Sequence, residues 1–476
     1  PSNYDSKLFE KITKKFSKLK GDEYSLLKIN DLLDDINDIA LSKQYEFINA
    51  SIVENIKDDK INFDINISES DKFYIEKINI KGNFNTLEEV VRNNLIVDEG
   101  DPFNEILFNK SINNIQSLGI FKTVDTNIKD GSNDTLKEID LKIVERPTGE
   151  ISLTAGFGTD GETIGGGLKE NNFLGKGIKL DTNIELTADS IKGKFIYAKP
   201  NFNYTDNTLF TSLKSSSSDF LTDSGYKTSE IGFSLGTRFE QFQNIYLSPE
   251  IDFLIEDLET SDKASSTLKK QEGSYTDLYF NYTVNQDLRD KKFRTESGYV
   301  TNFSQELPLI SDNSELSNAF EITNYKKLSS TSDMIGKVSF FGKTITGLSD
   351  DVRISKRLNV PSSKLRGFEK GKVGPVDNND YIGGNHVTAL NVSATLPNIF
   401  EGLDNLDIGI FFDAANVWGV DYDSSLDDKS TIRSSTGVAF NLLTPLGPLS
   451  FSFANALSKA SSDITETFRF RLGTQF

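Results

Sequence analysis

The chain has no cysteine and a single histidine, His386, among its 476 residues. Without cysteine there is no disulfide framework and no thiolate chemistry, and one histidine cannot build a histidine-rich metal site or an imidazole relay. His386 has no serine or cysteine nucleophile motif beside it, so we expect it to lie in a loop. These absences predict a protein that is not an enzyme and that carries no cofactor and no metal.

Basic residues are also scarce, with 52 lysines and arginines against 71 aspartates and glutamates and a net charge of -19. This balance argues against a nucleic-acid partner and against a polybasic surface that binds lipid headgroups. The acidic clusters Asp377–Asp380 and Asp421–Asp428 lack the spacing of an EF-hand calcium loop. We therefore expect both clusters to be solvated extracellular loops.

Long apolar runs are missing as well, and the mean hydropathy is -0.38. A transmembrane helix needs about 20 consecutive apolar residues, whereas a strand of a transmembrane barrel needs about 10, of which alternate ones face lipid. The composition therefore permits a membrane barrel. Pro1–Glu10 shows no basic segment followed by an apolar one, so we expect no signal peptide and interpret the chain as a mature or truncated product.

The first 147 residues carry helical periodicity, with apolar residues at three- and four-residue spacing over 9–16 and 26–39. Strand-like runs follow at 45–55 and 60–68. The same order returns about 75 residues later, which is typical of a repeat. The predicted elements of the second unit are a strand over 73–82, a helix over 86–95 capped by Asn85 or Thr86, a helix over 104–118 ended by Gly119, and strands over 121–129 and 135–144.

From about Thr148 onward, period-two alternation replaces the helical pattern, as in the runs 245–255, 278–284 and 406–412. Residues 148–476, at about 20 residues per strand with its share of loop, provide on the order of 16 strands. In the third run Asp407 and Asp413 have the parity opposite to the apolar residues. We expect these carboxylates to point away from lipid.

The last residues of the chain alternate most clearly. One face holds Phe468, Phe470, Leu472, Thr474 and Phe476, and the other holds Arg469, Arg471, Gly473 and Gln475. Aromatic side chains are favourable at a membrane interface and costly in water. This alternation predicts a membrane-facing barrel strand; the alternative is the edge strand of a soluble sheet.

Several motifs occur in a fixed order. They are Leu365-Arg366-Gly367-Phe368, followed by Gly374-Pro375 and Gly383-Gly384-Asn385, with Leu118–Phe121, Asn172–Gly177, Phe412–Trp418 and Pro445–Leu449 around them. With the two repeats, this ordered set resembles the superfamily of POTRA-plus-barrel proteins and, within it, the BamA family of bacterial outer-membrane assembly proteins. The resemblance implies α+β POTRA repeats of order βααββ at 1–72, where the first strand is missing, and at 73–147. A 16-stranded antiparallel transmembrane β-barrel at 148–476 then follows.

The resemblance also implies a site inside the barrel. In this family the loop that holds Leu365, Arg366, Gly367 and Phe368 folds back into the lumen, and acidic residues of the barrel wall hold its arginine. Asp413 stands at the matching wall position. A second carboxylate is common in the family four residues before the proline matched by Pro397, and this chain has Ser393 there. The alternative is that Arg366 is a solvated loop arginine.

The function that the resemblance implies is folding and insertion of other β-barrel proteins into the outer membrane. Unfolded barrel clients would be received by POTRA domains in the periplasm, with accessory assembly lipoproteins and membrane lipid as further partners. Insertion would occur at a lateral seam between the first strand, near 150–158, and the last, near 467–476. The expected seam residues are Ile151, Leu153, Ala155, Phe157, Phe468, Phe470, Leu472 and Phe476.

Glycines mark the early barrel strands. Gly156 and Gly158 would reduce packing at the seam, and we interpret Gly165–Gly167 as part of a flexible strand, since no Lys-Ser or Lys-Thr follows as in a phosphate-binding loop. Two other functions remain open. A two-partner secretion transporter has the same architecture with a plug helix upstream, and a passive porin would show a large stable conductance.

Overall fold

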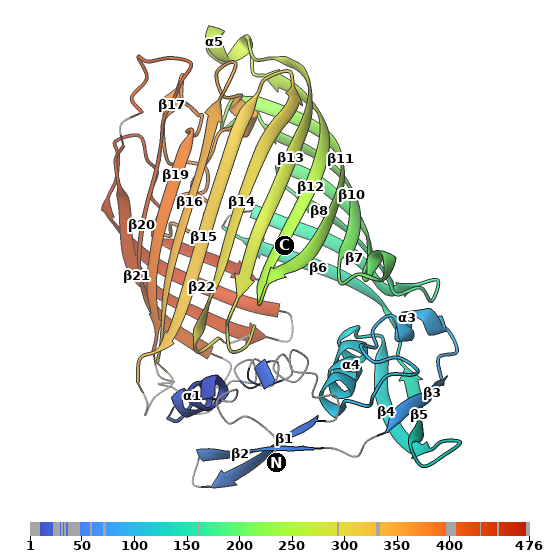
Figure 1. Ribbon diagram of the computed structural model, residues 1–476. Helices are drawn as coiled ribbons and strands as arrows, with labels where there is room; N and C mark the ends of the chain where they lie inside the picture. The colour runs from blue at the N-terminus through green and yellow to red at the C-terminus, as the bar shows by residue number, and fades with distance from the viewer. Residues whose placement is uncertain are drawn as a thin grey trace. The chain divides into compact units, whose positions relative to one another are not determined.

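The computed structural model describes residues 10–21, 29, 32, 35–36, 48–57, 60–69, 73–159, 161–292, 295–329, 334–396, 406–428, 430–444 and 447–472. The chain forms two compact units, Pro1–Gly149 with Glu170–Lys179, and Glu150–Lys169 with Leu180–Phe476. Figure 1 labels their helices and strands. Most of the predicted helix over 26–39, and the predicted end of the last strand at Phe476, lie outside the described residues.

The first unit opens with helix α1, Glu10–Lys18, and the antiparallel strands β1, Ile48–Lys57, and β2, Lys60–Glu69. Ile12 is buried on α1, as are Ile29, Leu32 and Ile36 at the spacing predicted for the next helix. The apolar face that the sequence indicated is therefore buried at each of these described positions.

The predicted second repeat is complete. Its elements are β3, Tyr74–Lys81; α3, Glu88–Arg92; α4, Glu105–Ser117; β4, Phe121–Asp130; and β5, Leu136–Glu145. β5 lies in the centre of the sheet, parallel to β3 and antiparallel to β4. Asn104 caps α4 by accepting a hydrogen bond from the Leu107 backbone N–H at 3.2 Å, and Gly119 follows the helix with φ of 69°. The core lies between the sheet and the helices and includes Ile75, Ile78, Val91, Ile115, Ile139 and Leu141.

The predicted cap of the first helix of this repeat is wrong. α3 begins at Glu88 after Leu87, without a side-chain cap. The backbone N–H groups of Asn85 and Thr86 instead donate to the Glu145 carboxylate at the end of β5, at 3.0 and 2.7 Å. A carboxylate is a stronger acceptor than a neutral side chain, so it holds this segment against the sheet and shortens the helix.

The Glu145 carboxyl is the titratable group in this junction, by which we mean the contact of Asn85 and Thr86 with the end of β5. Burial opposes its charged form, but the hydrogen bonds from Thr86 and Asn85 outweigh burial and hold the pKa of Glu145 below its ordinary value. A folded-state pKa below the unfolded value gives stability that is present above the unfolded pKa. That stability is lost as the pH falls through the folded pKa.

We predict that Glu145→Gln loosens this junction. Amide hydrogen exchange at Asn85 and Thr86 should become faster in the variant at neutral pH, because an amide oxygen accepts these bonds more weakly than a carboxylate. In the wild type their protection should fall as the pH drops below about 4.5, after correction for intrinsic exchange, whereas the variant should lack this step. Equal protection in both proteins at all pH values would contradict this role of Glu145.

The second unit is built around a closed antiparallel barrel, which is 16-stranded over the described part of the chain, as predicted. Figure 1 shows its tilted strands. They are β6, Gly149–Gly158; β7, Gly161–Phe173; β8, Ile178–Thr187; β9, Ser190–Lys199; β10, Thr208–Phe220; β11, Tyr226–Phe242; β12, Ile245–Thr260; β13, Gly273–Asp287; β14, Gly298–Ser311; β15, Glu315–Lys327; β16, Ile335–Gly347; β19, His386–Thr395; β20, Leu406–Trp418; β21, Arg433–Thr444; β22, Gly447–Ser458; and β23, Phe468–Leu472.

Short elements occupy the connections. They are the 3-10 turns η1, Phe202–Tyr204, and η2, Ile354–Lys356; the helix α5, Ser266–Lys269; and the small hairpin of β17, Val376–Asp377, with β18, Asp380–Tyr381. The glycines Gly165–Gly167, which the sequence analysis interprets as part of a strand, lie within strand β7.

Side chains alternate between the two faces of the barrel wall. Along β12, Phe253 and Ile255 are exposed on the outside, whereas Asp252 and Glu256 are buried on the inside. β20 repeats the pattern, because Phe412 is exposed and its neighbours Phe411 and Asp413 are buried. The apolar face is the one suited to lipid, and the carboxylates point inward.

Within the described ranges, none of the helices has the length and apolar character needed to cross a membrane.

Candidate functional site

The connection between β16 and β19, residues 348–385, folds back inside the barrel. Its outgoing and returning limbs pair with each other, since the backbone N–H of Leu358 donates to the Gly384 carbonyl at 2.7 Å and that of Gly384 donates to the Leu358 carbonyl at 2.9 Å. The loop tip, Leu365–Phe368, contacts inward residues of the wall and buries Leu365 and Phe368 almost completely. We call residues 348–385 the lumen loop.

Arg366 at the tip binds Asp413 of β20. Its side-chain Nε and Nη2 donate to the two carboxylate oxygens at 2.7 and 2.8 Å, and its backbone N–H donates to Oδ2 at 3.1 Å. The guanidinium lies over the Phe411 ring, with 3.4 Å between Cζ and the ring centroid. A planar fork, a fully buried carboxylate and an aromatic face form an arginine site that lysine cannot reproduce.

The second partner of this site is Asn391 on β19. Its side-chain nitrogen donates to the Asp413 carboxylate at 2.9 Å and to the Lys364 carbonyl at 2.6 Å. Ser393, which stands where the family commonly has a carboxylate, lies opposite Phe411 in the strand register. The sequence analysis did not identify Asn391. The alternation along β19 could have done so, because Asn391 lies two residues from Ser393 and therefore on the same face of the strand.

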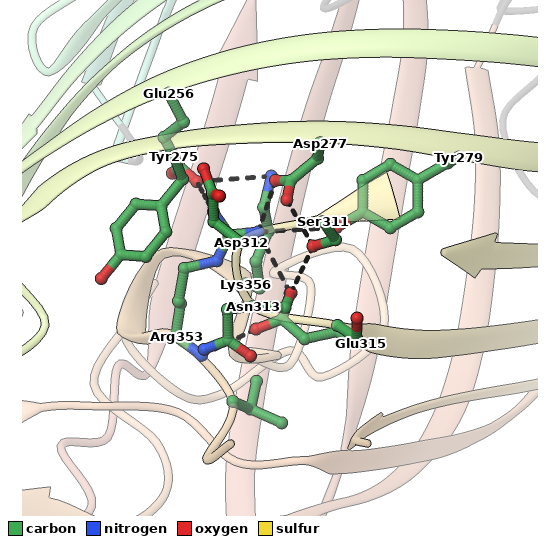
Figure 2. A network of polar contacts seen from close by, with 12 residues as sticks. Glu256, Tyr275, Asp277, Tyr279, Ser311, Asp312, Asn313, Glu315, Arg353 and Lys356 are labelled. Carbon is green, nitrogen blue, oxygen red and sulfur yellow. Dashed lines mark hydrogen bonds and ion pairs between the residues drawn. The ribbon is translucent and has the colours of Figure 1, made fainter. Parts of the chain in front are cut away.

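A second arginine of the lumen loop, Arg353, is fully buried against a different part of the wall. Its side chain contacts Asp277 of β13 at 2.6 Å, Glu256 of β12 at 3.2 Å and Glu315 of β15 at 3.4 Å. Its backbone N–H donates to Glu315 at 2.8 Å. Figure 2 shows the carboxylates gathered around Arg353. Sequence analysis missed this network, because its members come from four separate segments.

Two further contacts complete the Arg353 network. The Tyr275 ring lies under the guanidinium, with 4.5 Å between Cζ and the ring centroid. Lys356 Nζ lies 3.6 Å from Glu256 and 3.7 Å from Glu230. Two cations, Arg353 and Lys356, thus lie among four carboxylates of the wall and partly balance their negative charge, as buried charges require.

Arg357 binds the outgoing limb of the lumen loop to the connection after β20. It pairs with Asp421, donates to the Asn385 side chain at 3.0 Å and lies over the Tyr422 ring. The Tyr422 hydroxyl donates to Asp377 at 2.8 Å. Burial, with the Asp377 carboxylate, raises the pKa of Tyr422 well above its ordinary value.

Two expectations from the sequence are therefore wrong. Asp377 and Asp380 are not solvated, because they are buried where the β17–β18 hairpin packs against connections between barrel strands, as shown by the Tyr381 N–H donating to the Asp223 carbonyl and Tyr422 donating to Asp377. His386 is not in a loop; it is the first residue of β19, where it pairs with Trp418 and its ring lies 5.4 Å from that of Trp418. Among the described residues, no cluster of three or more histidine, aspartate or glutamate side chains is arranged to hold a metal ion.

The expected seam residues lie on β6 and β23, which close the barrel. The described residues of these strands pair at Gly158 with Arg471 and at Phe157 with Leu472. Ile151, Leu153, Ala155 and Phe157 are exposed on one face of β6, and Phe468 is exposed on β23. Phe470 contacts Phe157 with 5.7 Å between ring centroids, and Phe476 lies outside the described residues. At Gly158 an added Cβ would come 2.5 Å from the Phe470 carbonyl oxygen, so glycine here permits close approach of the two strands.

These features define a class of protein: a 16-stranded antiparallel barrel whose interior holds a loop bound through pairs of arginine with buried carboxylates. A protein-family model described as the Omp85 superfamily domain matches residues 172–476 of the sequence. The chain therefore belongs to the Omp85 superfamily. The POTRA model, described as a surface antigen variable number repeat, matches residues 73–146.

Curated relatives include the outer membrane protein assembly factor BamA of Neisseria meningitidis, 26% identical over 96% of this chain and 63% of that relative. BamA of Neorickettsia risticii is 23% identical over 88% of this chain and 57% of that relative. The chain thus spans about three fifths of the length of these relatives.

Two solved structures share the fold. BamA from Haemophilus ducreyi lacking POTRA domains 1-3 has a TM-score of 0.74 and 21% identity, covering 99% of this chain and 98% of that one. CdiB from Acinetobacter baumannii has a TM-score of 0.57 and 14% identity, covering 99% of this chain and 88% of that one.

We predict that Arg366→Ala destabilises the barrel by about 3 kcal/mol, because it leaves the buried Asp413 carboxylate without its fork. Arg366→Lys should be intermediate, since it keeps the charge but not the planar geometry. The measurement is the temperature at which the folded band is lost on a heat-modifiability gel. Amide protection in the 73–147 repeat serves as the control and should not change. A wild-type gel profile for Arg366→Ala would count against this anchor.

We predict a loss of about 3–5 kcal/mol for Arg353→Met, because three buried carboxylates then lose their main cation. Adding Glu256→Gln, Asp277→Asn and Glu315→Gln to this variant should recover much of the loss, since neutral side chains no longer need the charge. Urea unfolding in lipid vesicles measures both effects. If the combined variant is less stable than Arg353→Met alone, charge balance is not what Arg353 provides.

Proposed function

We propose that this chain is an insertase that folds and inserts other β-barrel proteins into the outer membrane. The observation that carries the proposal is a lumen occupied by a loop that Arg353 and Arg366 anchor to the wall, together with a closing strand, β6, whose outer face is apolar. The similarity to chains named outer membrane protein assembly factor BamA supports the same conclusion.

We propose the domain organisation that suits this function. POTRA-like repeats at 1–72 and 73–147 would lie in the periplasm and receive unfolded barrel clients. The barrel at 148–476 would lie in the outer membrane, in contact with its lipid. Accessory assembly lipoproteins would be partners of the complete protein. The match of the POTRA model to residues 73–146 supports the second repeat.

The physical basis is the free edge of a sheet. A closed barrel is stable because no strand has unpaired backbone groups, and a machine that adds strands has to expose such groups for a time. When β6 and β23 separate, each offers an edge on which an incoming strand can pair by β-augmentation. The exposed apolar residues on β6, such as Ile151 and Leu153, suit an edge that lies next to lipid.

The alternative function is export of a polypeptide through the lumen, as in a two-partner secretion transporter. Arg353 and Arg366 bind different parts of the wall, so the lumen loop would have to leave both sites before a chain could pass. Insertion at the seam needs neither rupture. We therefore favour insertion. An assay separates the two functions by the final location of the client, which is the membrane for insertion and the inside of the liposome for export.

We predict that the chain, reconstituted in liposomes, accelerates insertion of an unfolded barrel client over empty liposomes. A disulfide between Phe157→Cys and Leu472→Cys, which face each other across the seam, should abolish the acceleration, and a reductant should restore it. The chain has no other cysteine.

The matched control places cysteines at Leu213 and Phe233, an outward-facing pair on β10 and β11 away from the seam. Its disulfide should leave insertion unchanged. Unimpaired insertion with the seam disulfide fully formed would exclude the seam. Protease-protected client inside the liposomes, in place of membrane-inserted client, would favour the transporter.

A further inference from the structure

The connection from β22 to β23 pairs with the lumen loop. Phe368 and Thr465 form an antiparallel bridge. The Glu369 N–H donates to the Ile464 carbonyl at 3.0 Å, the Ile464 N–H to the Lys372 carbonyl at 3.1 Å, and the Glu466 N–H to the Gly367 carbonyl at 3.1 Å. Residues 464–466 thus form a short ladder with the end of the loop tip and the residues that follow it.

Arg469 of β23 strengthens this ladder from the barrel wall. Its side chain is buried, and its guanidinium donates to the Ser362 carbonyl at 2.8 Å and the Phe368 carbonyl at 2.5 Å. Nε donates to Glu466 at 2.9 Å, which sets the orientation of the fork. A single side chain of the closing strand therefore holds the lumen loop before its tip, at Ser362, and at the end of its tip, at Phe368, through charge-assisted hydrogen bonds.

Asp463 ties the same connection to a further strand. Its buried carboxylate receives the Arg433 side chain from β21 at 2.9 and 3.1 Å and the Gly374 N–H of the lumen loop at 3.3 Å. The Tyr381 hydroxyl donates to the Ser462 carbonyl at 2.6 Å. We call the contacts between residues 462–469 and the lumen loop the clasp.

We propose that the clasp fixes the closing strand β23, that Arg469 is its positioning residue, and that β6 is the strand that moves when the seam opens. This rests on the proposed insertase function. β23 is held from inside the barrel by its own arginine and by the ladder directly before it. The clasp adds these contacts on the β23 side of the seam, and movement of β6 leaves them intact.

The first test measures the clasp without any client. In lipid nanodiscs, Arg469→Gln should increase hydrogen exchange about tenfold at the Glu369, Ile464 and Glu466 amides, because the ladder loses its charged donor. Arg471→Gln, which removes an arginine from the same face of the same strand, is the matched control and should leave these amides unchanged. Arg469→Lys keeps the charge without the fork and should be intermediate.

Unchanged exchange in Arg469→Gln, or an equal increase in Arg471→Gln, would overturn the positioning role of Arg469. If Arg469→Gln fails to fold, Arg469→Lys provides the same comparison.

The second test locks the clasp. Glu369→Cys with Ile464→Cys places a disulfide across two opposed, exposed residues of the ladder. With this bond formed, insertion of the client should keep its wild-type rate, because β23 does not need to leave the loop. Loss of insertion in the locked protein would overturn the proposal. If the wild type itself does not accelerate insertion, the insertase function fails, and the exchange measurement still decides whether the clasp exists.

Discussion

An arginine keeps its positive charge when it is buried, and this constraint organises the interior of the barrel. Two arginines of the lumen loop meet carboxylates of the barrel wall. Arg353 meets Asp277, Glu256 and Glu315, and Arg366 meets Asp413. Because these partners lie on β12, β13, β15 and β20, the loop is held to separate parts of the wall. A net charge of -19 is compatible with this interior, since much of the inward negative charge is paired.

In the proposed mechanism the barrel opens at the closing pair of strands, while the loop stays anchored to the wall. The clasp adds an asymmetry to that picture, because the contacts of Arg469 and Asp463 hold the β23 side. A lumen occupied by an anchored loop and apolar side chains on the outer face of β6 suit the proposed insertase. A lumen occupied in this way is poorly suited to a pore, which needs an open passage.

The sequence predicted the features that depend on local periodicity. Alternation identified the barrel strands and placed Asp413 on the inner face, and the motif around Arg366 identified the tip of the lumen loop. Arg353 was missed because its partners lie on strands that are distant in sequence, and pairing between them is invisible to local spacing. Asp377 and Asp380 were taken as solvated because a cluster of carboxylates looks polar along the chain, although the fold buries it. The cap of α3 was misassigned because the Glu145 carboxylate, about 60 residues away, outcompetes local side chains for the same N–H groups.

Conductance across a planar bilayer tests most directly the claim that buried arginines hold the loop across the lumen. The purified chain should show low conductance, and a variant that combines Arg353→Met with Arg366→Ala should show large, long-lived openings, because both anchors are lost. A wild type that conducts steadily like a water-filled pore, or a double variant that folds and remains as closed as the wild type, would contradict the account.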